Sequence, residues 1–217
     1  MQLETGSRLL MIGDSITDCG RDYNLPPAAG NSFGEGYVNL INGCLTGLMP
    51  ESKIMVINKG ISGNTILDLR RRWKEDVLDL KPDYVSVMIG VNDVWRHFDS
   101  ILQQMEQVDL GTFKNTYREL IENTRPKVKN MILLSPFMLE ENREDNMRKM
   151  LDQYTKAVQE LADEYGLLFV DVQAKMDQFL THLSSYMLAG DRVHPNTAGH
   201  MIIAKAFLDA VSFSWEK

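Results

Sequence analysis

Positive charge is scarce in this sequence of 217 residues. Its 23 lysines and arginines stand against 30 aspartates and glutamates, which gives a formal net charge of −7 at pH 7. A nucleic-acid backbone or an anionic membrane face repels such a protein at long range. We therefore expect no nucleic-acid partner and no membrane partner, and a neutral or small ligand instead.

Cysteine is rare too, and no apolar run approaches the length of a membrane span. Cys19 and Cys44 could pair, but two cysteines in a chain of this length are more often free buried thiols. The first ten residues, MQLETGSRLL, lack the basic segment and long apolar run of an export signal. The sequence therefore predicts a cytoplasmic protein with free thiols.

Metal-ligand patterns are missing as well. The four histidines form no cluster of the HExxH kind, and Asp14 and Asp18 lack the paired spacing that a magnesium phosphatase needs. We therefore expect no metal site.

What the sequence does contain is an alternation of short apolar runs with longer segments of helical period, the pattern of crossover units. The short runs are apolar on both faces, as the strands of a helix-covered parallel sheet are. A hydrophobic content of 44% suits one substantial core. We predict a single domain, residues 1–217, folded as a three-layer α/β/α sandwich with a five-stranded parallel sheet. The predicted strands are 8–12, 53–58, 84–89, 130–134 and 167–170, and the clearest helices are 65–80, 145–165 (with Gly166 as a left-handed stop) and 196–210.

Three of the predicted strands end in a turn of glycine and polar residues. The turns are 13–15 (GDS), 58–64 (NKGISGN) and 90–93 (GVND). In open α/β sheets the ligand crevice lies outside the carboxyl ends of the strands, near the point where the strand order reverses. We therefore expect the three turns to converge on one site.

Ser15 stands in the first of these turns and has three interpretations. It could cap the following helix, since Asp and Ser are favoured N-caps. It could help to cradle a phosphate, although the turn lacks the glycine spacing and the lysine of a P-loop. It could also be a nucleophile, which requires a base, a group that orients the base, and donors aimed at the developing oxyanion.

His194 is the histidine whose surroundings best suit the base. Pro195 holds it in extended geometry and suits the first turn of the helix that follows. Asp191, three residues earlier, could accept a hydrogen bond from Nδ1 and leave Nε2 facing the serine. Alternatively, residues 191–194 could form an ordinary exposed turn in which His194 is hydrogen-bonded and has no catalytic role. His97 is a second histidine that could approach the site.

Donors for the oxyanion are available in the turns. Ser15 and Gly63 can each offer a backbone N–H, and Asn92 can offer a side-chain amide. Considered alone, Gly63 would be interpreted as a turn glycine with positive φ, and Asn92 would be interpreted as part of an Asx turn or as a helix cap. Taken together with Ser15 and His194, they favour an oxyanion hole.

Four stretches resemble, in order and spacing, the signature blocks of the SGNH hydrolases, also called GDSL-type esterases: GDS at 13–15, GISGNT at 60–65, GVND at 90–93 and DRVHP at 191–195. The resemblance spans nearly the whole chain. It implies a flavodoxin-like α/β/α fold and ester hydrolysis without a cofactor. It also implies roles for single residues: Ser15 as nucleophile, His194 as base, Asp191 as its orienting group, and Gly63 and Asn92 as oxyanion donors beside the Ser15 amide.

Within that family the sequence is most similar to intracellular acetylxylan esterases, which deacetylate xylo-oligosaccharides. It departs at Ile16, where the family name expects leucine, and at Gly190, where these esterases can carry a bulky aromatic residue. The resemblance implies a small-molecule or oligosaccharide ester as substrate. The same triad would also serve a broad short-chain carboxylesterase, a lysophospholipase or a thioesterase, and the same fold could serve a non-catalytic sugar-binding module.

Aromatic residues suggest two further features. Trp95 and Phe33, expected on loops near the site, are candidates for stacking on a sugar ring, with ordinary loop packing as the alternative. Phe213 and Trp215, close to the C-terminal end, would be exposed unless something covers them. That cover could be a second subunit in a homo-oligomer or another part of the same chain.

Overall fold

A five-stranded parallel sheet forms the centre of the molecule in the computed structural model, which describes residues 1–98 and 106–215. Neighbouring strands all run parallel, in the order β2-β1-β3-β4-β5. This confirms the predicted sheet. The strands are β1 (Arg8–Gly13), β2 (Met55–Gly60), β3 (Tyr84–Met88), β4 (Asn130–Leu134) and β5 (Leu168–Val170).

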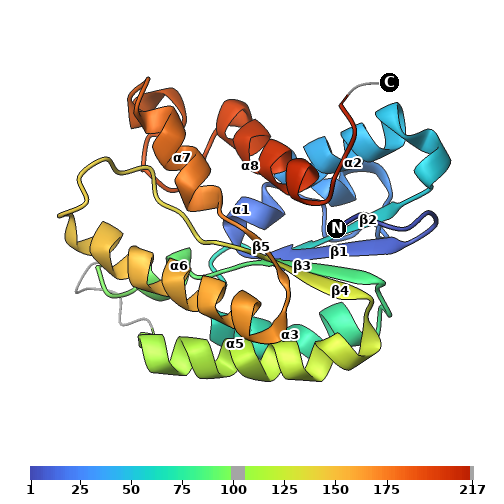
Figure 1. The fold of residues 1–217 in the computed structure, drawn as a ribbon, viewed down its shortest axis with the longest axis horizontal. Coiled ribbons are helices and arrows are strands. Elements are labelled where there is room, and N and C mark those ends of the chain that lie inside the picture. Colours follow the sequence, from blue (N-terminus) through green and yellow to red (C-terminus); the bar gives the residue numbers. More distant parts are fainter. Residues whose placement is uncertain (99–105, 216–217) are drawn as a thin grey trace.

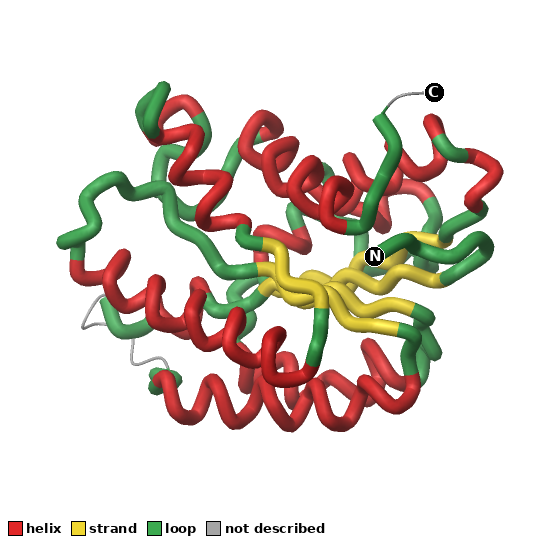
Figure 2. Tube along the Cα trace, viewed as in Figure 1, coloured by secondary structure: helices red, strands yellow, loops and turns green. Residues whose placement is uncertain are grey.

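Helices cover both faces of the sheet. Figure 1 and Figure 2 show α2, α7 and α8 above it and α3, α5 and α6 below it. Within the upper layer α2 and α7 pack against α8, and within the lower layer α3 and α6 pack against α5. The molecule is therefore the three-layer α/β/α sandwich that the sequence predicts. The helices are α1 (Ser15–Asp18), α2 (Tyr37–Leu48), α3 (Ile66–Trp73), α4 (Val91–Trp95), α5 (Leu110–Thr124), α6 (Asn146–Tyr165), α7 (Val172–Leu180) and α8 (Thr197–Ala210).

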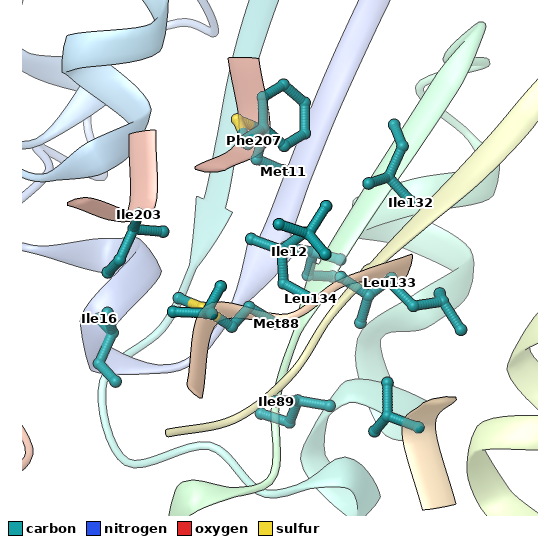
Figure 3. Packing of buried hydrophobic residues seen from close by; sticks show 14 of the residues in the cluster. Met11, Ile12, Ile16, Met88, Ile89, Ile132, Leu133, Leu134, Ile203 and Phe207 are labelled. Atoms are coloured by element: carbon teal, nitrogen blue, oxygen red, sulfur yellow. The ribbon is translucent and has the colours of Figure 1, made fainter. Parts of the chain in front are cut away.

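The strands are deeply buried. Residues 9–12 of β1 and 131–134 of β4 have no exposed surface. Figure 3 shows Met11 and Ile12 of β1 among side chains of β3, β4 and α8. Burying an aliphatic side chain of this size contributes about 1.5–3 kcal/mol. The sheet is thus a rigid platform for the turns at its carboxyl edge.

Most predicted boundaries lie within one residue of the observed ones, but β2 and the helix predicted over 65–80 differ by more. β2 begins at Met55 rather than at residue 53, because Lys53 ends a short 3-10 turn in the left-handed conformation, with φ +50°. The helix predicted over 65–80 divides into α3, which ends at Trp73, and a π-helical turn, Lys74–Leu78.

Two other helix ends can be compared with their sequence signals. Gly166 follows α6 with φ +62°, which confirms the predicted left-handed stop. Asn196 caps α8, because its Oδ1 accepts hydrogen bonds from the N–H groups of Ala198 and Gly199. Pro195 therefore stands before the cap, and its predicted place in the first turn of the helix is wrong.

The strand order reverses between β1 and β3. The chain passes from β1 to β2 on one side and then to β3 on the other, an arrangement that opens a crevice at the carboxyl ends of these strands. Gly13, the last residue of β1, pairs with Gly60 and Met88. A Cβ on Gly13 would lie 2.3 Å from both the Met88 carbonyl oxygen and Thr17 Oγ1. Only glycine lets the 13–15 turn sit this close to its neighbours.

The C-terminal aromatic residues are covered to different degrees. Phe213 is buried, and its ring packs edge-on against that of Trp215 with centroids 4.9 Å apart. Trp215 stays 43% exposed and donates a hydrogen bond from Nε1 to Asp209 at 2.7 Å. The cover for Phe213 therefore comes from the same chain.

Cys19 and Cys44 are both free thiols, as predicted, but each is only partly buried. Over residues 1–98 and 106–215, no helix is long and apolar enough to cross a membrane.

Candidate active site

Ser15 is the first residue of α1, directly after the turn that ends β1. Asp14 caps this helix, because its Oδ1 accepts a hydrogen bond from the Ile16 N–H at 3.0 Å. The capping role that the sequence leaves open for Ser15 therefore belongs to Asp14. The Ser15 hydroxyl oxygen instead lies 2.8 Å from His194 Nε2.

Asp191 holds the other side of the His194 ring. Its Oδ2 lies 2.6 Å from His194 Nδ1, and its Oδ1 accepts the backbone N–H groups of Val193 and His194 at 3.0 and 2.8 Å. A carboxylate only accepts, so Nδ1 carries the proton and Nε2 presents its lone pair to Ser15. Burial raises the pKa of the Asp191 carboxyl, but these hydrogen bonds outweigh it and hold that pKa below its ordinary value.

The loop that carries Asp191 and His194 is anchored through Arg192. This residue has φ +69°, a strained conformation for a residue other than glycine. Its carbonyl oxygen accepts a hydrogen bond from the Leu139 N–H at 2.8 Å, and its guanidinium pairs with Glu140. The loop that carries Asp191 and His194 is thus fixed to the segment that follows β4, an anchor that the sequence analysis did not find.

Ser15 and His194 open onto a cavity of about 620 Å³ at the carboxyl edge of the sheet. Gly63, with φ +81°, and Asn92 line the same cavity. The three turns therefore converge, as the sequence predicts. The Asn92 side chain donates one hydrogen bond from Nδ2 to the Asn64 carbonyl oxygen at 3.0 Å. Because the amide nitrogen carries two hydrogens, the second is available to a ligand.

The expected loop positions of Trp95 and Phe33 are wrong, because Trp95 is the last residue of α4 and Phe33 ends a 3-10 turn, Gly30–Phe33. The two side chains also behave differently. Trp95 lines the cavity, with its ring 5.9 Å from that of His194. Phe33 is not part of the cavity lining, and its partly buried side chain packs against the hydrophobic core. His97 does not line the cavity either. Its Nε2 lies 3.1 Å from the Val108 carbonyl oxygen instead. The geometry supports a ligand contact for Trp95 and ordinary packing for Phe33.

His200 lines the cavity although the sequence analysis gave it no role. Its Nδ1 accepts the Tyr37 N–H at 3.2 Å, so the proton sits on Nε2, which lies 3.3 Å from Cys19 Sγ. Burial, and then the charge of His194, lower the His200 pKa to about 4, so this ring is neutral at pH 7. Its place shortly after His194, inside the predicted helix 196–210, is the signal that could have found it.

Two buried carboxyl groups lie beneath the cavity, on Asp14 and Asp93. Asp93 accepts a hydrogen bond from the Ile66 N–H at 3.0 Å and so joins the start of α3 to the GVND turn. Burial raises the pKa of each carboxyl to about 7. Nowhere in the described part of the chain do three or more His, Cys, Asp or Glu side chains form a group that could hold a metal ion.

Residues 11–202, which contain every site residue named above, match the model of the GDSL-like lipase/acylhydrolase family. The chain belongs to this family. The resemblance of its four sequence blocks is thereby confirmed.

Several individual proteins are similar to this chain over nearly its whole length. The acetylxylan esterase of Geobacillus stearothermophilus is 48% identical over 215 residues, which cover 99% of this chain and 98% of that enzyme. A crystal structure of its catalytic mutant S15A has a TM-score of 0.95 at 47% identity and covers 100% and 99% of the two chains. Its catalytic mutants D191A and H194A each have a TM-score of 0.96, also at 47% identity and with the same coverage. LAE5, an α/β hydrolase from the metagenome of Lake Arreo in Spain, has a TM-score of 0.95 at 47% identity and covers 97% of each chain. The SGNH hydrolase fold is therefore confirmed.

Proposed function

We propose that this GDSL-family chain is a serine esterase that removes acetyl groups from acetylated xylo-oligosaccharides through a Ser-His-Asp acyl-enzyme mechanism. The observation that carries the proposal is the hydrogen-bonded series from Asp191 through His194 to Ser15, with distances of 2.6 and 2.8 Å, at the wall of a cavity. Each group has the neighbour that its role requires. The catalytic mutants of the Geobacillus esterase, S15A, D191A and H194A, supply further support, because this chain carries the same residue types at those numbers.

The geometry fits each step of that mechanism. His194 Nε2 accepts the hydroxyl proton while Ser15 Oγ attacks the acetyl carbonyl carbon, and Asp191 stabilises the imidazolium that forms. His194 then gives the proton to the departing sugar oxygen, which leaves the acetyl group esterified to Ser15. A water molecule attacks this ester with His194 again as base, and acetate leaves as the serine recovers its proton.

The oxyanion of each tetrahedral intermediate is proposed to bind three donors. These are the backbone N–H groups of Ser15 and Gly63 and the side-chain amide of Asn92. Two observations support this assignment. All three residues line the same cavity, and the hydrogen bond to the Asn64 carbonyl oxygen orients the Asn92 amide. Each such preorganised donor contributes a factor of about a hundred or more in rate.

Two observations support a carbohydrate acetate as substrate. The Geobacillus acetylxylan esterase matches this chain over nearly its full length. Trp95 offers an aromatic face close to His194, which suits stacking on a sugar ring. Glu35 and Arg96 also line the cavity and bring polar groups that can hydrogen-bond sugar hydroxyls.

A second candidate keeps the triad and changes the substrate to that of a broad carboxylesterase, lysophospholipase or thioesterase. It is favoured by the family itself, which includes lipases and acylhydrolases. Rates on acetyl, butyryl and octanoyl nitrophenyl esters, together with acetyl loss from acetylated xylo-oligosaccharides by mass spectrometry, separate the two. We expect acetyl to be preferred and the oligosaccharide to lose acetyl. Preference for octanoyl would overturn the deacetylase assignment.

Ser15→Ala tests the mechanism itself. It should lower kcat on nitrophenyl acetate by more than about a thousandfold, because among the described residues Ser15 alone places a hydroxyl against His194 Nε2. The urea midpoint should stay at the wild-type value. Wild-type turnover in this variant would exclude Ser15 as the nucleophile. A non-catalytic sugar-binding module, in contrast, would bind the oligosaccharide without releasing acetate.

We further propose that residues 1–217 act as one catalytic domain in the cytoplasm. A hydrophobic cluster that extends to both faces of the sheet supports one domain, and two free thiols suit a reducing compartment. The half-exposed Trp215 is a candidate subunit contact. Light scattering of the wild type and Trp215→Ala tests a homo-oligomer, and cell fractionation tests the location.

A further inference from the structure

Arg72 links α3 to the turns that form the active site. It is the second-last residue of α3, and its side chain is only 14% exposed. Arg70 and Arg71, beside it in the sequence, have side chains that are 47% and 59% exposed and pair with surface acids. Of these three consecutive arginines, Arg72 is the one directed into the protein.

The Arg72 guanidinium donates four hydrogen bonds. Nη2 donates to the Gly13 carbonyl oxygen at 3.0 Å, and Nη1 donates to the Lys59 carbonyl oxygen at 2.8 Å. Nη1 also donates to Asp76 Oδ2 at 2.8 Å, and Nε donates to Asn64 Oδ1 at 2.8 Å. One side chain thus joins the carboxyl ends of β1 and β2 to the turn that follows β2.

These acceptors lie next to the groups that act on the substrate. Gly13 stands two residues before Ser15. Asn64 directly follows Gly63, and its carbonyl oxygen accepts the hydrogen bond from Asn92. The three turns that supply oxyanion donors are therefore all connected to Arg72, two of them directly and the third through Asn64.

Only an arginine satisfies these acceptors together. A guanidinium presents its donors in a fixed planar fork, whereas a lysine has a single ammonium at the end of a flexible stem. Asp76 neutralises the charge and is itself paired with Lys59 at 2.9 Å. Four hydrogen bonds fix the guanidinium, and its charge already has a carboxylate partner. This suits a part that sets geometry rather than one that binds a charged ligand.

We propose that Arg72 is a positioning residue that holds Gly63 and Asn92 in place against Ser15, so that it acts on the transition state and not on substrate binding. The proposal rests on the esterase function proposed above. Donors that are already in place when the oxyanion forms need no reorganisation, and a displacement of about 1 Å costs up to about a hundredfold in rate.

The first test compares Arg72→Lys with Arg70→Lys, a matched control on the same helix that keeps the charge at an exposed position. For Arg72→Lys we expect kcat on nitrophenyl acetate to fall by about tenfold to a hundredfold, with KM within about twofold of wild type. Arg70→Lys should leave both values unchanged. A wild-type kcat in Arg72→Lys, or a loss confined to KM, would overturn the proposal.

A second variant covers the case in which Arg72→Lys fails to fold. Asn64→Ala removes the side-chain oxygen that accepts from Arg72 Nε. It keeps the backbone carbonyl oxygen of residue 64, which accepts from Asn92, and it keeps the hydrogen bonds from Arg72 to Gly13 and Lys59. We expect kcat to fall by about tenfold, and the double variant to be no slower than Arg72→Lys alone. Wild-type kcat in Asn64→Ala, or multiplicative effects in the double variant, would show that Arg72 does not act through this turn.

A substrate-independent readout separates this proposal from the proposed function. Phosphonylation of Ser15 by a fluorophosphonate, followed by mass spectrometry, depends on the same oxyanion donors and on no sugar. Arg72→Lys should slow it by the same factor as kcat, and equal labelling rates would refute the positioning role. Fast labelling of the wild type without acetyl loss from xylo-oligosaccharides would refute the substrate and leave the Arg72 result standing.

Discussion

Asp14→Asn should make the protein more stable at alkaline pH and leave it nearly unchanged at acid pH. The Asp14 carboxyl is buried beneath the active site, and burial raises its pKa from 3.8 to about 7. Asparagine keeps an oxygen in place to accept the Ile16 N–H, and it mimics the neutral carboxyl in size. The variant therefore changes charge with little change in packing.

The sign follows from proton binding. Between pH 3.8 and about 7 the folded protein keeps a proton on Asp14 that the unfolded chain has released. The free energy of unfolding therefore falls as pH rises through this window, and the fall is complete above the folded pKa. A shift of about three pKa units at about 1.4 kcal/mol each corresponds to about 4 kcal/mol over the whole window.

Urea unfolding at about pH 5 and about pH 8 measures most of this effect. Between these two pH values the Asp14 contribution to the free energy of unfolding should fall by about 3 kcal/mol, which lowers the urea midpoint by about 1 M. Asp93 contributes in the same direction, because burial, followed by the charge of Asp14, raises its pKa. Asp14→Asn should thus remove at least half of the wild-type pH dependence. Asp79→Asn, at a half-exposed carboxyl, is the control. If wild type and Asp14→Asn show the same pH dependence, Asp14 is ionised in the folded protein and the reasoning is wrong.

Three further substitutions test the site. Gly13→Ala places a Cβ 2.3 Å from the Met88 carbonyl oxygen and should lower the free energy of unfolding, measured in urea, by about 3 kcal/mol. An unchanged free energy would mean that β1 and β3 can move apart without cost. Asp191→Asn should lower kcat by about a thousandfold, because the amide oxygen stays on the two backbone N–H groups that Oδ1 accepts and the NH2 group then faces Nδ1 of His194, which favours the wrong tautomer. A loss below about threefold would contradict the orienting role. Trp95→Ala should lower kcat/KM about tenfold on acetylated xylo-oligosaccharides and much less on nitrophenyl acetate. An equal loss on both substrates would contradict sugar stacking.

The sheet and the place of the site could be predicted because each depends on a local pattern. Five apolar runs predict five strands, and a parallel sheet brings their carboxyl ends to one edge, so GDS, GISGNT and GVND had to meet there. Capping is less determined by sequence, because Asp14 and Ser15 are both good caps and only the backbone path decides between them. The start of β2 depends in the same way on Lys53, whose left-handed conformation no residue preference predicts.

Contacts between distant segments were beyond the sequence. Arg70, Arg71 and Arg72 are identical in type, and the sequence analysis did not single out Arg72 from the run. Helical periodicity turns each by about 100° from the next, but only the position of α3 against the sheet determines which one points inward. Phe33 shows the converse, since the sequence places it on a loop near the site whereas the structure packs it against the core at the end of a 3-10 turn.

The strained turn at Arg192 shows how stability and catalysis are balanced in this site. Glycine would adopt φ +69° without strain, but it would also give the unfolded chain more freedom and supply no side chain. Arg192 is strained in this conformation, but its side chain forms an ion pair with Glu140 and its carbonyl oxygen accepts a hydrogen bond from the Leu139 N–H. Because Arg192 is the residue next to Asp191, both contacts help to fix the aspartate before a substrate binds. In the proposed mechanism this loop orients the base and Arg72 holds the turns that carry the oxyanion donors, so little of the geometry that the transition state needs has to be formed during the reaction.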